Sequence, residues 1–388
     1  MSRKVLFFVL VSALVCAVCF FSGTAVKPVK FNVVMLDGEL VAFNKTYDCS
    51  FSASALSRLF YGSNPRNMLN SRFKGNASNF LDYLNSDIKS DVVALAKRLS
   101  FSPVEPNVNF LGKGEFVFTD GKNGRNCDEN TALQKAAEKE TSNLSFDVIP
   151  PKKTVDELKK DAQPSGRAKT AYFTSGKARK NNVELAAKRL DGKTVLPGEK
   201  LSFNEVVGKR TTENGFSEAK VIVYGEYTGG VGGGVCQVST TLYNAWLCAG
   251  LDAEKSLCHS LEPSYVAPGL DAMVSETSDL VLVNNSSSPA YIGAFYDGNY
   301  LEFVVYSRSL PCTIKLASEF VRAIPCDEYK VVYGEEEKIL SYPKNGAIYR
   351  SYREYIVDGE VALKEPLRTS AYLPQKGKIS KIKFSDEE

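Results

Sequence analysis

Apolar side chains recur at helical spacing directly after the glycine-rich segment 229–234. Steps of three and four residues separate the apolar positions, which are Val238, Leu242, Ala245, Trp246 and Ala249. This rhythm predicts an amphipathic helix that Gly250 closes. The glycine-rich segment therefore predicts a turn that leads straight into a helix, and Cys236 stands where the two meet.

Other stretches of the chain show both helical and strand patterns. Apolar positions at 77–99 and at 177–190 recur at steps of three and four, which predicts two more helices. Strand patterns lie at 31–36, 279–283 and 290–307. The last of these predicts a β-hairpin that turns at Asp297-Gly298. Many strands around few helices predict a β-rich α+β fold.

Changes in pattern along the chain predict three folded parts. The polar segment 161–166 predicts a hinge, which separates an N-terminal region at 26–160 from a central domain at 168–310. The N-terminal region combines strands, a hairpin and a helix capped near Asp128. The C-terminal part, 327–384, contains two strand runs joined by a turn and is predicted to be a short β-rich extension.

The N-terminus has the layout of an export signal. Arg3 and Lys4 precede an uncharged apolar run at 5–21, and small residues follow at 22–25. This layout predicts that 1–25 is a signal peptide or an uncleaved membrane anchor. Positive charge before the apolar run predicts export of the remaining chain in either case, as a secreted or membrane-anchored extracytoplasmic protein.

Charge and cysteine spacing narrow the classes of partner. The formal net charge is only +3 at pH 7, and no basic block or RNA-binding motif accompanies it, so nucleic acid is not a predicted partner. Outside the export segment the chain has no CxxC pair, and Cys258 beside His259 has poor spacing for metal ligands. We therefore predict no metal site and no cofactor.

The cysteine count predicts at least one free thiol. Two of the nine cysteines, Cys16 and Cys19, lie in the export segment, and cleavage would leave an odd number. An odd number outside the cytoplasm leaves one thiol unpaired. Cys236 is the predicted free thiol, and Cys312 with Cys326 is the predicted local disulfide. The alternative is that most cysteines are reduced and buried.

Cys236 and His259 carry the candidate chemistry. Free amides and the macrodipole at a helix start stabilise a thiolate, which predicts a low pKa for the Cys236 thiol. His259 is the only histidine in the chain. The two residues are the parts of a Cys-His nucleophilic site. Other interpretations stay open, because cysteines are often buried packing residues and glycine-rich turns also bind anions without doing chemistry.

Three ordered motifs resemble the signature of the VanW family: LPGEKLSFNEVVGKRT at 196–211, GFSEAKVIVYGEYTGGVGGGVCQVSTTLYNA at 215–245 and CHSLEPSYVAPGLDA at 258–272. The resemblance covers 168–306. Gly121, Gly124-Arg125, the helix predicted after Cys127 and the segment 154–158 lie in residues 91–160. Through these markers, residues 91–160 resemble the peptidoglycan-binding domain found beside VanW and transpeptidase domains. The extension at 327–384 is faintly similar to the G5-type extensions that follow some VanW domains.

The resemblance implies L,D-transpeptidation of peptidoglycan, with peptidoglycan stem peptides as partners. Cys236 is then the expected nucleophile, which attacks the carbonyl of an L,D peptide bond in a donor stem and releases D-alanine. His259 is the expected base, which takes the thiol proton and returns one to the leaving amine. The thioester would pass the acyl group to a side-chain amine of a neighbouring stem.

Further residues of the motifs are expected to hold the substrate or an oxyanion. Backbone amides at 233–237 are expected to line an oxyanion pocket. The predicted oxyanion and substrate-binding residues are Gly233, Gly234, Gln237, Ser239, Ser260, Tyr265 and Asp271. For Ser239 and Thr240 the alternative is capping of free helix amides. Asp271 is predicted either to orient His259 or to be a turn residue.

One position departs from the family pattern, and other functions stay open. The usual Pro-Pro-Gly-Arg-Asp-Ala reads Ala-Pro-Gly-Leu-Asp-Ala here, with Leu270 at the place of the arginine. If that arginine binds a substrate carboxylate, the contact is either missing here or supplied elsewhere, with Lys209 and Arg210 as the candidates. One alternative function is a non-catalytic accessory protein that binds the D-alanine of peptidoglycan. Another is a cysteine L,D-carboxypeptidase, in which water accepts the acyl group.

Overall fold

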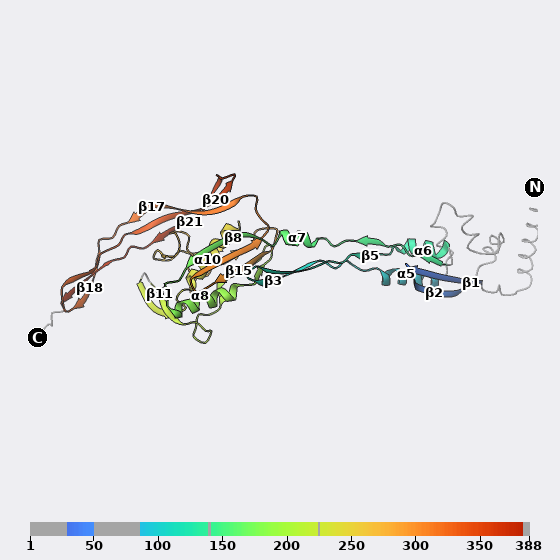
Figure 1. The fold of residues 1–388 in the computed structure, drawn as a ribbon, viewed down its shortest axis with the longest axis horizontal. Coiled ribbons are helices and arrows are strands. Elements are labelled where there is room, and N and C mark those ends of the chain that lie inside the picture. Colours follow the sequence, from blue (N-terminus) through green and yellow to red (C-terminus); the bar gives the residue numbers. More distant parts are fainter. Residues whose placement is uncertain (1–28, 50–85, 139–140, 224–225, 383–388) are drawn as a thin grey trace, which may run out of the picture. The chain divides into compact units, whose positions relative to one another are not determined.

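The computed structural model describes residues 29–49, 86–138, 141–223 and 226–382 (Figure 1). The predicted export segment and the first part of the helix predicted at 77–99 lie outside these residues. The chain forms two compact units, which we describe separately. Unit 1 comprises the residues up to Pro106 together with Asp120–Thr154, and the remaining residues form unit 2.

Unit 1 is a small α+β unit with its own core. Its elements are β1 (Val29–Asp37), β2 (Leu40–Cys49), α5 (Ser86–Leu99), β5 (Gly124–Asn126), α6 (Glu129–Glu138), β6 (Thr141–Asn143) and β7 (Asp147–Ile149). β1 pairs with β2 antiparallel and with β6 parallel. Ile88, Val92 and Leu95 recur at helical spacing and are buried in the core that α5 forms with α6. The predicted cap at Asp128 is confirmed, because its Oδ1 accepts a hydrogen bond from the Thr131 amide at 2.7 Å.

Unit 2 begins with strands and helices that surround one central helix. Up to residue 307 its elements are β3 (Asn107–Gly112), β4 (Glu115–Thr119), α7 (Val155–Lys160), β8 (Gln163–Ala171), α8 (Lys177–Leu190), β9 (Lys193–Val195), β10 (Lys200–Ser202), α9 (Phe203–Val207), β11 (Glu218–Val223), β12 (Glu226–Val231), α10 (Val235–Cys248), β13 (Asp252–Lys255), β14 (Val281–Val283), β15 (Ala290–Tyr296) and β16 (Tyr300–Ser307). The main sheet has the strand order β8-β16-β15-β9 and is antiparallel throughout. A second sheet has the order β10-β14-β13.

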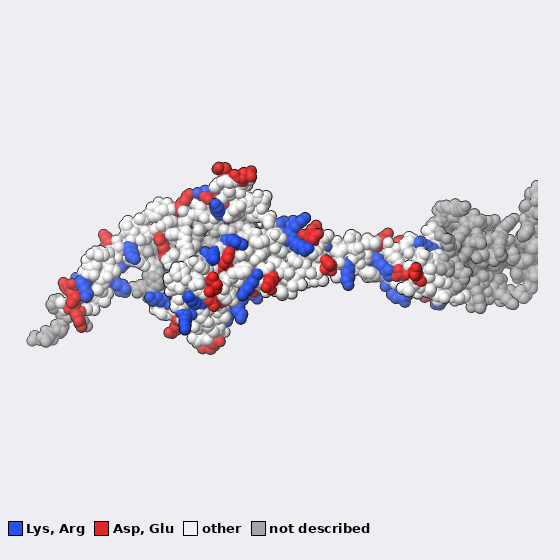
Figure 2. Space-filling view, in the orientation of Figure 1, with Lys and Arg blue, Asp and Glu red and all other residues white. Residues whose placement is uncertain are grey.

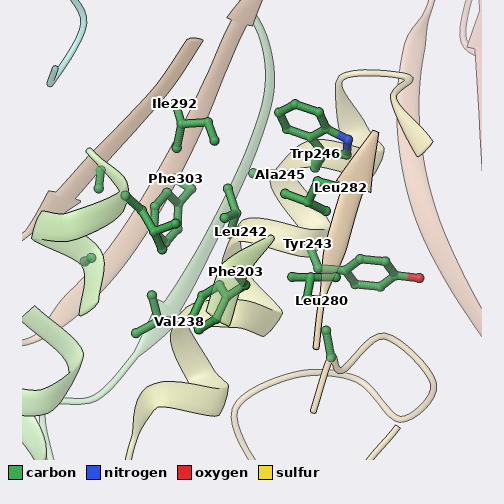
Figure 3. Packing of buried hydrophobic residues seen from close by; sticks show 14 of the residues in the cluster. Phe203, Val238, Leu242, Tyr243, Ala245, Trp246, Leu280, Leu282, Ile292 and Phe303 are labelled. Atoms are coloured by element: carbon green, nitrogen blue, oxygen red, sulfur yellow. The ribbon is translucent and has the colours of Figure 1, made fainter. Parts of the chain in front are cut away.

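The helix α10 lies in the middle of the unit 2 core. It packs on β8 and β16 of the main sheet, and α8 packs on β15 and on α10 (Figure 1). Figure 3 shows its apolar side chains among those of the surrounding elements: Val238, Leu242, Ala245 and Trp246 with Phe203, Leu280, Leu282, Ile292 and Phe303. Nearly the whole helix is buried. Packing therefore fixes the body of α10, while Cys236 in its first turn is only partly buried.

Several predicted elements are confirmed in unit 2. The helix predicted at 177–190 is α8, and the helix predicted after the glycine-rich segment is α10. β15 and β16 form the predicted hairpin. Its turn contains Gly298 with a φ of 82°, a conformation that favours glycine. The described residues thus form a β-rich structure with few helices, as the α+β prediction requires.

The hinge predicted at 161–166 is wrong, because this segment enters the main sheet. β8 begins at Gln163 and pairs with the end of β16. Asp161 is buried, and its carboxylate accepts hydrogen bonds from Ser288 and Arg308. A Cβ at Gly166 would lie 2.3 Å from the carbonyl oxygen of Ala245 in α10. The small polar residues therefore mark close packing of a strand on a helix, which local composition does not distinguish from a linker.

Residues 313–382 form six strands, which we call the C-terminal β module. Its strands are β17 (Thr313–Ile324), β18 (Tyr329–Gly334), β19 (Lys338–Ser341), β20 (Gly346–Val357), β21 (Glu360–Tyr372) and β22 (Gly377–Ile382). They form two sheets, β17-β20-β21 and β18-β22-β19. The module is β-rich as expected, but its first strand begins before residue 327.

The predicted disulfide between Cys312 and Cys326 is wrong. Both thiols are free, and the two residues stand at opposite ends of the 12-residue strand β17. A strand of that length spans about 40 Å. Bridged cysteines have Cα atoms within about 7 Å of each other. Short spacing in the sequence therefore does not bring these thiols together, because the segment between them is extended.

The described surface carries both signs of charge. Figure 2 shows Lys and Arg mixed with Asp and Glu over the face of unit 2 that it presents. Among the helices of the described residues, none has the length and apolar character needed to span a membrane.

Candidate active site

Steric constraints place Cys236 in the first turn of α10. Gly234, directly before the helix, has a φ of 107°, in the left-handed region that favours glycine. A Cβ at Gly233 would lie 2.5 Å from the backbone oxygen of Lys220 in β11. The glycine-rich segment is thus required both for its conformation and for its close packing. It turns the chain sharply into α10, where free amides and the helix dipole favour a thiolate.

The Cys236 thiol faces a polar environment. Its Sγ lies 3.3 Å from the carbonyl oxygen of Val274 and hydrogen-bonds the His259 side chain. Burial raises the pKa of this thiol, but the hydrogen bond and positive charge of His259 outweigh burial and hold the pKa below its usual value. The positive charge of Arg210 acts in the same direction. The thiolate is therefore more populated at neutral pH than that of an ordinary cysteine.

His259 lies between Cys236 and Asp271 and is buried. Its Nδ1 lies 2.6 Å from Oδ2 of Asp271, and its backbone amide donates to the same oxygen at 2.7 Å. Because Nδ1 faces Asp271, Nε2 is the ring nitrogen that is left to meet Cys236. Burial lowers the pKa of His259, but the bonds to Asp271 and Cys236 raise it to about 9. The geometry and charges favour a thiolate–imidazolium pair.

Asp271 is fully buried and has partners on both carboxylate oxygens. Oδ2 meets His259, while Oδ1 accepts a hydrogen bond from the Tyr372 hydroxyl at 2.6 Å and lies 3.3 Å from Nη2 of Arg368. Burial raises the pKa of Asp271, but the hydrogen bonds from His259 and Tyr372 outweigh it and lower the pKa. Asp271 is therefore ionised at neutral pH and completes a Cys–His–Asp array.

Two of the backbone amides predicted to line an oxyanion pocket are already hydrogen-bonded in the structure. The amides of Val235 and Gln237 donate to the carbonyls of Gly232 and Gly234, at 3.1 and 3.0 Å. This leaves the amides of Gly233, Gly234 and Cys236 as the candidate donors. The glycine turn and Cys236 are close together in the chain, so these amides belong to the same turn as the thiol.

The Gln237 side chain ties α10 to neighbouring elements. It donates to the Thr170 hydroxyl and the Ala171 carbonyl, both at 2.9 Å, and accepts from Arg179 at 2.8 Å. All its polar atoms thus have protein partners, and the side chain is 1% exposed. The structure gives this side chain a role in holding the helix start in place.

Ser239 and Thr240 hold the chain next to Asp271. The Ser239 hydroxyl donates to the carbonyl of Ala272 at 2.6 Å, and the Thr240 hydroxyl accepts from the Ala272 amide at 2.9 Å. The expected alternative, capping of helix amides, is wrong for these side chains, because they bond a neighbouring segment. They join α10 to the loop that carries Asp271.

Tyr265 and Ser260 also belong to the site region. The Tyr265 hydroxyl lies beside Thr240, and burial together with the charge of Cys236 raises its pKa well above the usual value. The Tyr265 hydroxyl therefore remains protonated near the Cys236 thiol. Ser260 follows His259 in the chain, and its carbonyl accepts a hydrogen bond from the Leu373 amide at 2.7 Å.

The two candidate replacements for the family arginine differ in position. Leu270 is a buried apolar residue, and Lys209 is exposed. Arg210 lies close enough to Cys236 to affect its pKa, and it donates to the carbonyl of Ser275 at 3.1 Å. Its buried Nε has no hydrogen-bond partner among the described residues. Arg210 is thus the better placed of the two.

Sequence reasoning missed Arg368 and Tyr372. Both lie in β21 of the C-terminal β module, about a hundred residues after the motif that contains Asp271. No local pattern marks them, because a strand residue that points to a distant loop looks like any other strand residue. Only the pairing of β21 in the folded chain reveals them.

The described residues contain no group of three or more His, Cys, Asp or Glu side chains that is arranged to hold a metal ion.

Comparison with known proteins identifies the segment that contains this array. Residues 178–306 match the model of the family described as VanW like protein. The uncharacterized protein YoaR of Bacillus subtilis (strain 168) is 42% identical over 149 residues, which are 38% of this chain and 49% of YoaR. The vancomycin B-type resistance protein VanW of Enterococcus faecalis (strain ATCC 700802 / V583) is 31% identical over 115 residues, 28% of this chain and 42% of VanW. The chain thus spans less than half of the length of these relatives.

A solved structure gives a weaker similarity. The crystal structure of HP0197-G5 is 22% identical to this chain, covering 18% of it and 96% of that protein, with a TM-score of 0.11. This score is too low to support an argument about fold. The G5-type resemblance of the C-terminal extension stays a prediction.

Proposed function

Because this chain contains a VanW-like domain at residues 178–306, we propose that it is a cysteine acyltransferase that cross-links peptidoglycan by L,D-transpeptidation. The observation that carries the proposal is the array of Cys236, His259 and Asp271 at the start of α10. A thiolate, a proton carrier and backbone amides at one point are the groups that acyl transfer needs.

In the first half of the reaction, the Cys236 thiolate attacks the carbonyl carbon of the L,D peptide bond in a donor stem. The negative charge that develops on the carbonyl oxygen is stabilised by the amides of Gly233, Gly234 and Cys236. The carbon–nitrogen bond then breaks, and the His259 imidazolium protonates the leaving amine of D-alanine. The products of this step are a thioester on Cys236 and free D-alanine.

In the second half, neutral His259 takes a proton from the side-chain amine of a neighbouring stem as that amine attacks the thioester. The carbon–sulfur bond breaks, and an amide bond joins the two stems. Cys236 leaves as a thiolate beside a reprotonated His259, so the starting pair is restored. Asp271 stabilises the imidazolium in both halves because its charge lies against Nδ1.

We propose that Arg210 binds the carboxylate of the departing D-alanine. This arginine lies near the thiol, and its buried Nε has no hydrogen-bond partner within the described part of the chain. A guanidinium recognises a carboxylate through paired hydrogen bonds. Arg210 thereby takes the role that we expected of the family arginine replaced by Leu270.

The place of action that fits this substrate is the cell wall. Arg3, Lys4 and the apolar run after them support export of the chain, as a secreted protein or through a membrane anchor. The resemblance of residues 91–160 to a peptidoglycan-binding domain supports a second contact with the wall. In this proposal unit 1 holds the polymer while unit 2 performs the chemistry.

The test is to incubate the exported chain with purified disaccharide-tetrapeptide and to analyse the products by mass spectrometry. We expect cross-linked dimers and free D-alanine, and we expect both to vanish in Cys236→Ala and in His259→Ala. Cys248→Ala is the matched control, because it removes a thiol from the other end of the same helix. Trimmed stems without dimers would instead identify an L,D-carboxypeptidase, and bound but unchanged substrate would identify an accessory binding protein.

A further inference from the structure

We propose that the C-terminal β module is a working part of the active site, in which Tyr372 and Arg368 are positioning residues that fix Asp271 against His259. This inference rests on the proposed function for its chemistry, but its structural content concerns only the Cys–His–Asp array. It extends the site beyond the VanW-like domain, which ends at residue 306.

The segment that carries the array has little secondary structure of its own. Between β13 and β14 the chain runs from Ser256 to Leu280 without a helix or a strand, and both His259 and Asp271 lie in this segment. A catalytic geometry must be held to within about half an ångström, which an isolated loop does not provide. The position of both side chains therefore depends on the elements packed against the loop.

The bonds of Tyr372 fix the direction of its proton. Tyr372 ends β21 and is 1% exposed. Its hydroxyl oxygen accepts a hydrogen bond from the Gly269 amide at 2.5 Å, and Oδ1 of Asp271 lies 2.6 Å away. Because the amide is a donor only, the hydroxyl must donate its own proton to the carboxylate. Burial and the charge of Asp271 raise the pKa of Tyr372, so this proton is retained.

The two oxygens of the Asp271 carboxylate therefore have different partners. Tyr372 and Arg368 occupy Oδ1, which leaves Oδ2 to accept from the backbone and to meet the ring of His259. Arg368 also donates to the backbone oxygen of Asp271. Its guanidinium lies 5.5 Å from the ring centre of Tyr243 in α10, so it is held from a second side. Loss of the Oδ1 partners would free the carboxylate to rotate away from His259.

The module is anchored on both sides of this contact. Leu373 donates its amide to the carbonyl of Ser260 at 2.7 Å, next to His259. Ser318 of β17 donates to the carbonyl of Pro268. Farther away, the buried Arg353 of β20 donates to Asp252 and to the carbonyl of Leu251, each at 3.0 Å. These bonds attach strands of the module to the loop and to the end of α10. β21 and the loop with His259 and Asp271 therefore belong to the same folded unit.

The experiment measures the reactivity of Cys236 rather than turnover of peptidoglycan. The full chain is alkylated with iodoacetamide over a range of pH, and modification of Cys236 is quantified by peptide mass spectrometry. Wild type is compared with Tyr372→Phe, Arg368→Gln and Arg368→Lys. The matched control is Tyr349→Phe. The centre of the Tyr349 ring lies 6.1 Å from that of Tyr372 on the neighbouring strand, but the hydroxyl that donates to Asp271 is that of Tyr372.

We expect Tyr372→Phe to slow alkylation at neutral pH by about tenfold, the effect of one charge-assisted hydrogen bond, and to move its midpoint to higher pH. Arg368→Gln should move the midpoint in the same direction, and Arg368→Lys should restore much of the reactivity because it keeps the charge. Tyr349→Phe should follow wild type. A merely structural role would lower the thermal midpoint without moving the pH profile.

An unchanged pH profile in either folded variant, Tyr372→Phe or Arg368→Gln, would overturn the positioning role. The outcome is separable from that of the proposed function. If wild type forms no cross-links while the variants still shift the alkylation profile, transpeptidation is wrong and the positioning role stands. If cross-links form and both variants keep the wild-type profile, the reverse holds.

Discussion

Nδ1 of His259 and Oδ2 of Asp271 are 2.6 Å apart, and the backbone amide of His259 donates to the same oxygen at 2.7 Å. One carboxylate oxygen thus holds both the ring and the main chain of His259. Because Nδ1 is occupied, the orientation of the ring is fixed and Nε2 is left to meet Cys236. The relationship also explains why the pKa of His259 is raised to about 9 although the ring is buried.

Asp271→Asn tests this relationship directly. The amide carries no charge, so we expect the pKa of His259 to fall from about 9 and the transpeptidation rate to fall by roughly a thousandfold. The alkaline limb of the pH–rate profile should move to lower pH, since the imidazolium is lost sooner. Asp297→Asn, which alters an exposed carboxylate in the turn of the β15–β16 hairpin, should leave the profile in place. A wild-type profile in Asp271→Asn would contradict the assignment.

The pH dependence of the proposed transpeptidation by wild type should be bell-shaped. The acid limb reports deprotonation of the Cys236 thiol, so activity rises with pH. Because the pKa of this thiol is lowered, the rise is complete at a lower pH than for an ordinary cysteine. The alkaline limb reports loss of the His259 imidazolium near a pH of about 9. Both limbs belong to the coupled pair rather than to either residue alone. Reaction rates that climb steadily above pH 9 would contradict this prediction, because they would show that the reaction needs only a thiolate and a neutral His259.

The elements around the nucleophile could be predicted because their signals are local. The spacing of Val238, Leu242 and Trp246 identifies α10, and the glycine-rich segment identifies the turn before it. Likewise, a cysteine at that turn and the only histidine of the chain indicated which residues would meet. Their proximity follows from the fold, in which α10 is buried and the loop with His259 lies at its start.

The remaining features depend on long-range packing. Tyr372 and Arg368 reach Asp271 from a separate sheet, and no periodicity in β21 distinguishes them. The polar segment at 161–166 looked like a linker because small residues serve both linkers and close strand–helix contacts. The sequence also could not predict the hydrogen bonds of the Gln237 side chain, because a glutamine at a helix start can face either a substrate or a neighbouring strand.

The glycine turn offers a stability test with a matched control in the same segment. Gly233→Ala places a Cβ 2.5 Å from the backbone oxygen of Lys220, which must shift. A Cβ at Gly229 would meet nothing within 4 Å. We expect Gly233→Ala to lower the free energy of unfolding by about 1–3 kcal/mol, a typical cost of overpacking. Gly229→Ala should change it by less than about 0.5 kcal/mol.

Urea denaturation of the two glycine variants provides the measurement, with cross-linking activity as the second readout. Since the amides of Gly233 and Gly234 are the candidate oxyanion donors, Gly233→Ala should also reduce the cross-linking rate in its folded population. Equal stability and equal activity of the two variants would show that the turn tolerates a side chain and that close packing does not determine its sequence.

The role of Arg210 is tested through the carboxylate of the donor. We expect Arg210→Gln to raise the KM for the tetrapeptide donor about tenfold, since a charge-assisted hydrogen bond contributes about 1.5–3 kcal/mol. A donor whose terminal D-alanine is amidated should be poor for wild type and no poorer for Arg210→Gln, because both lack the same contact. Lys209→Gln is the control, as Lys209 is the exposed neighbour. If wild type accepts acid and amide donors equally well, Arg210 acts on the thiol pKa alone and does not bind the substrate carboxylate.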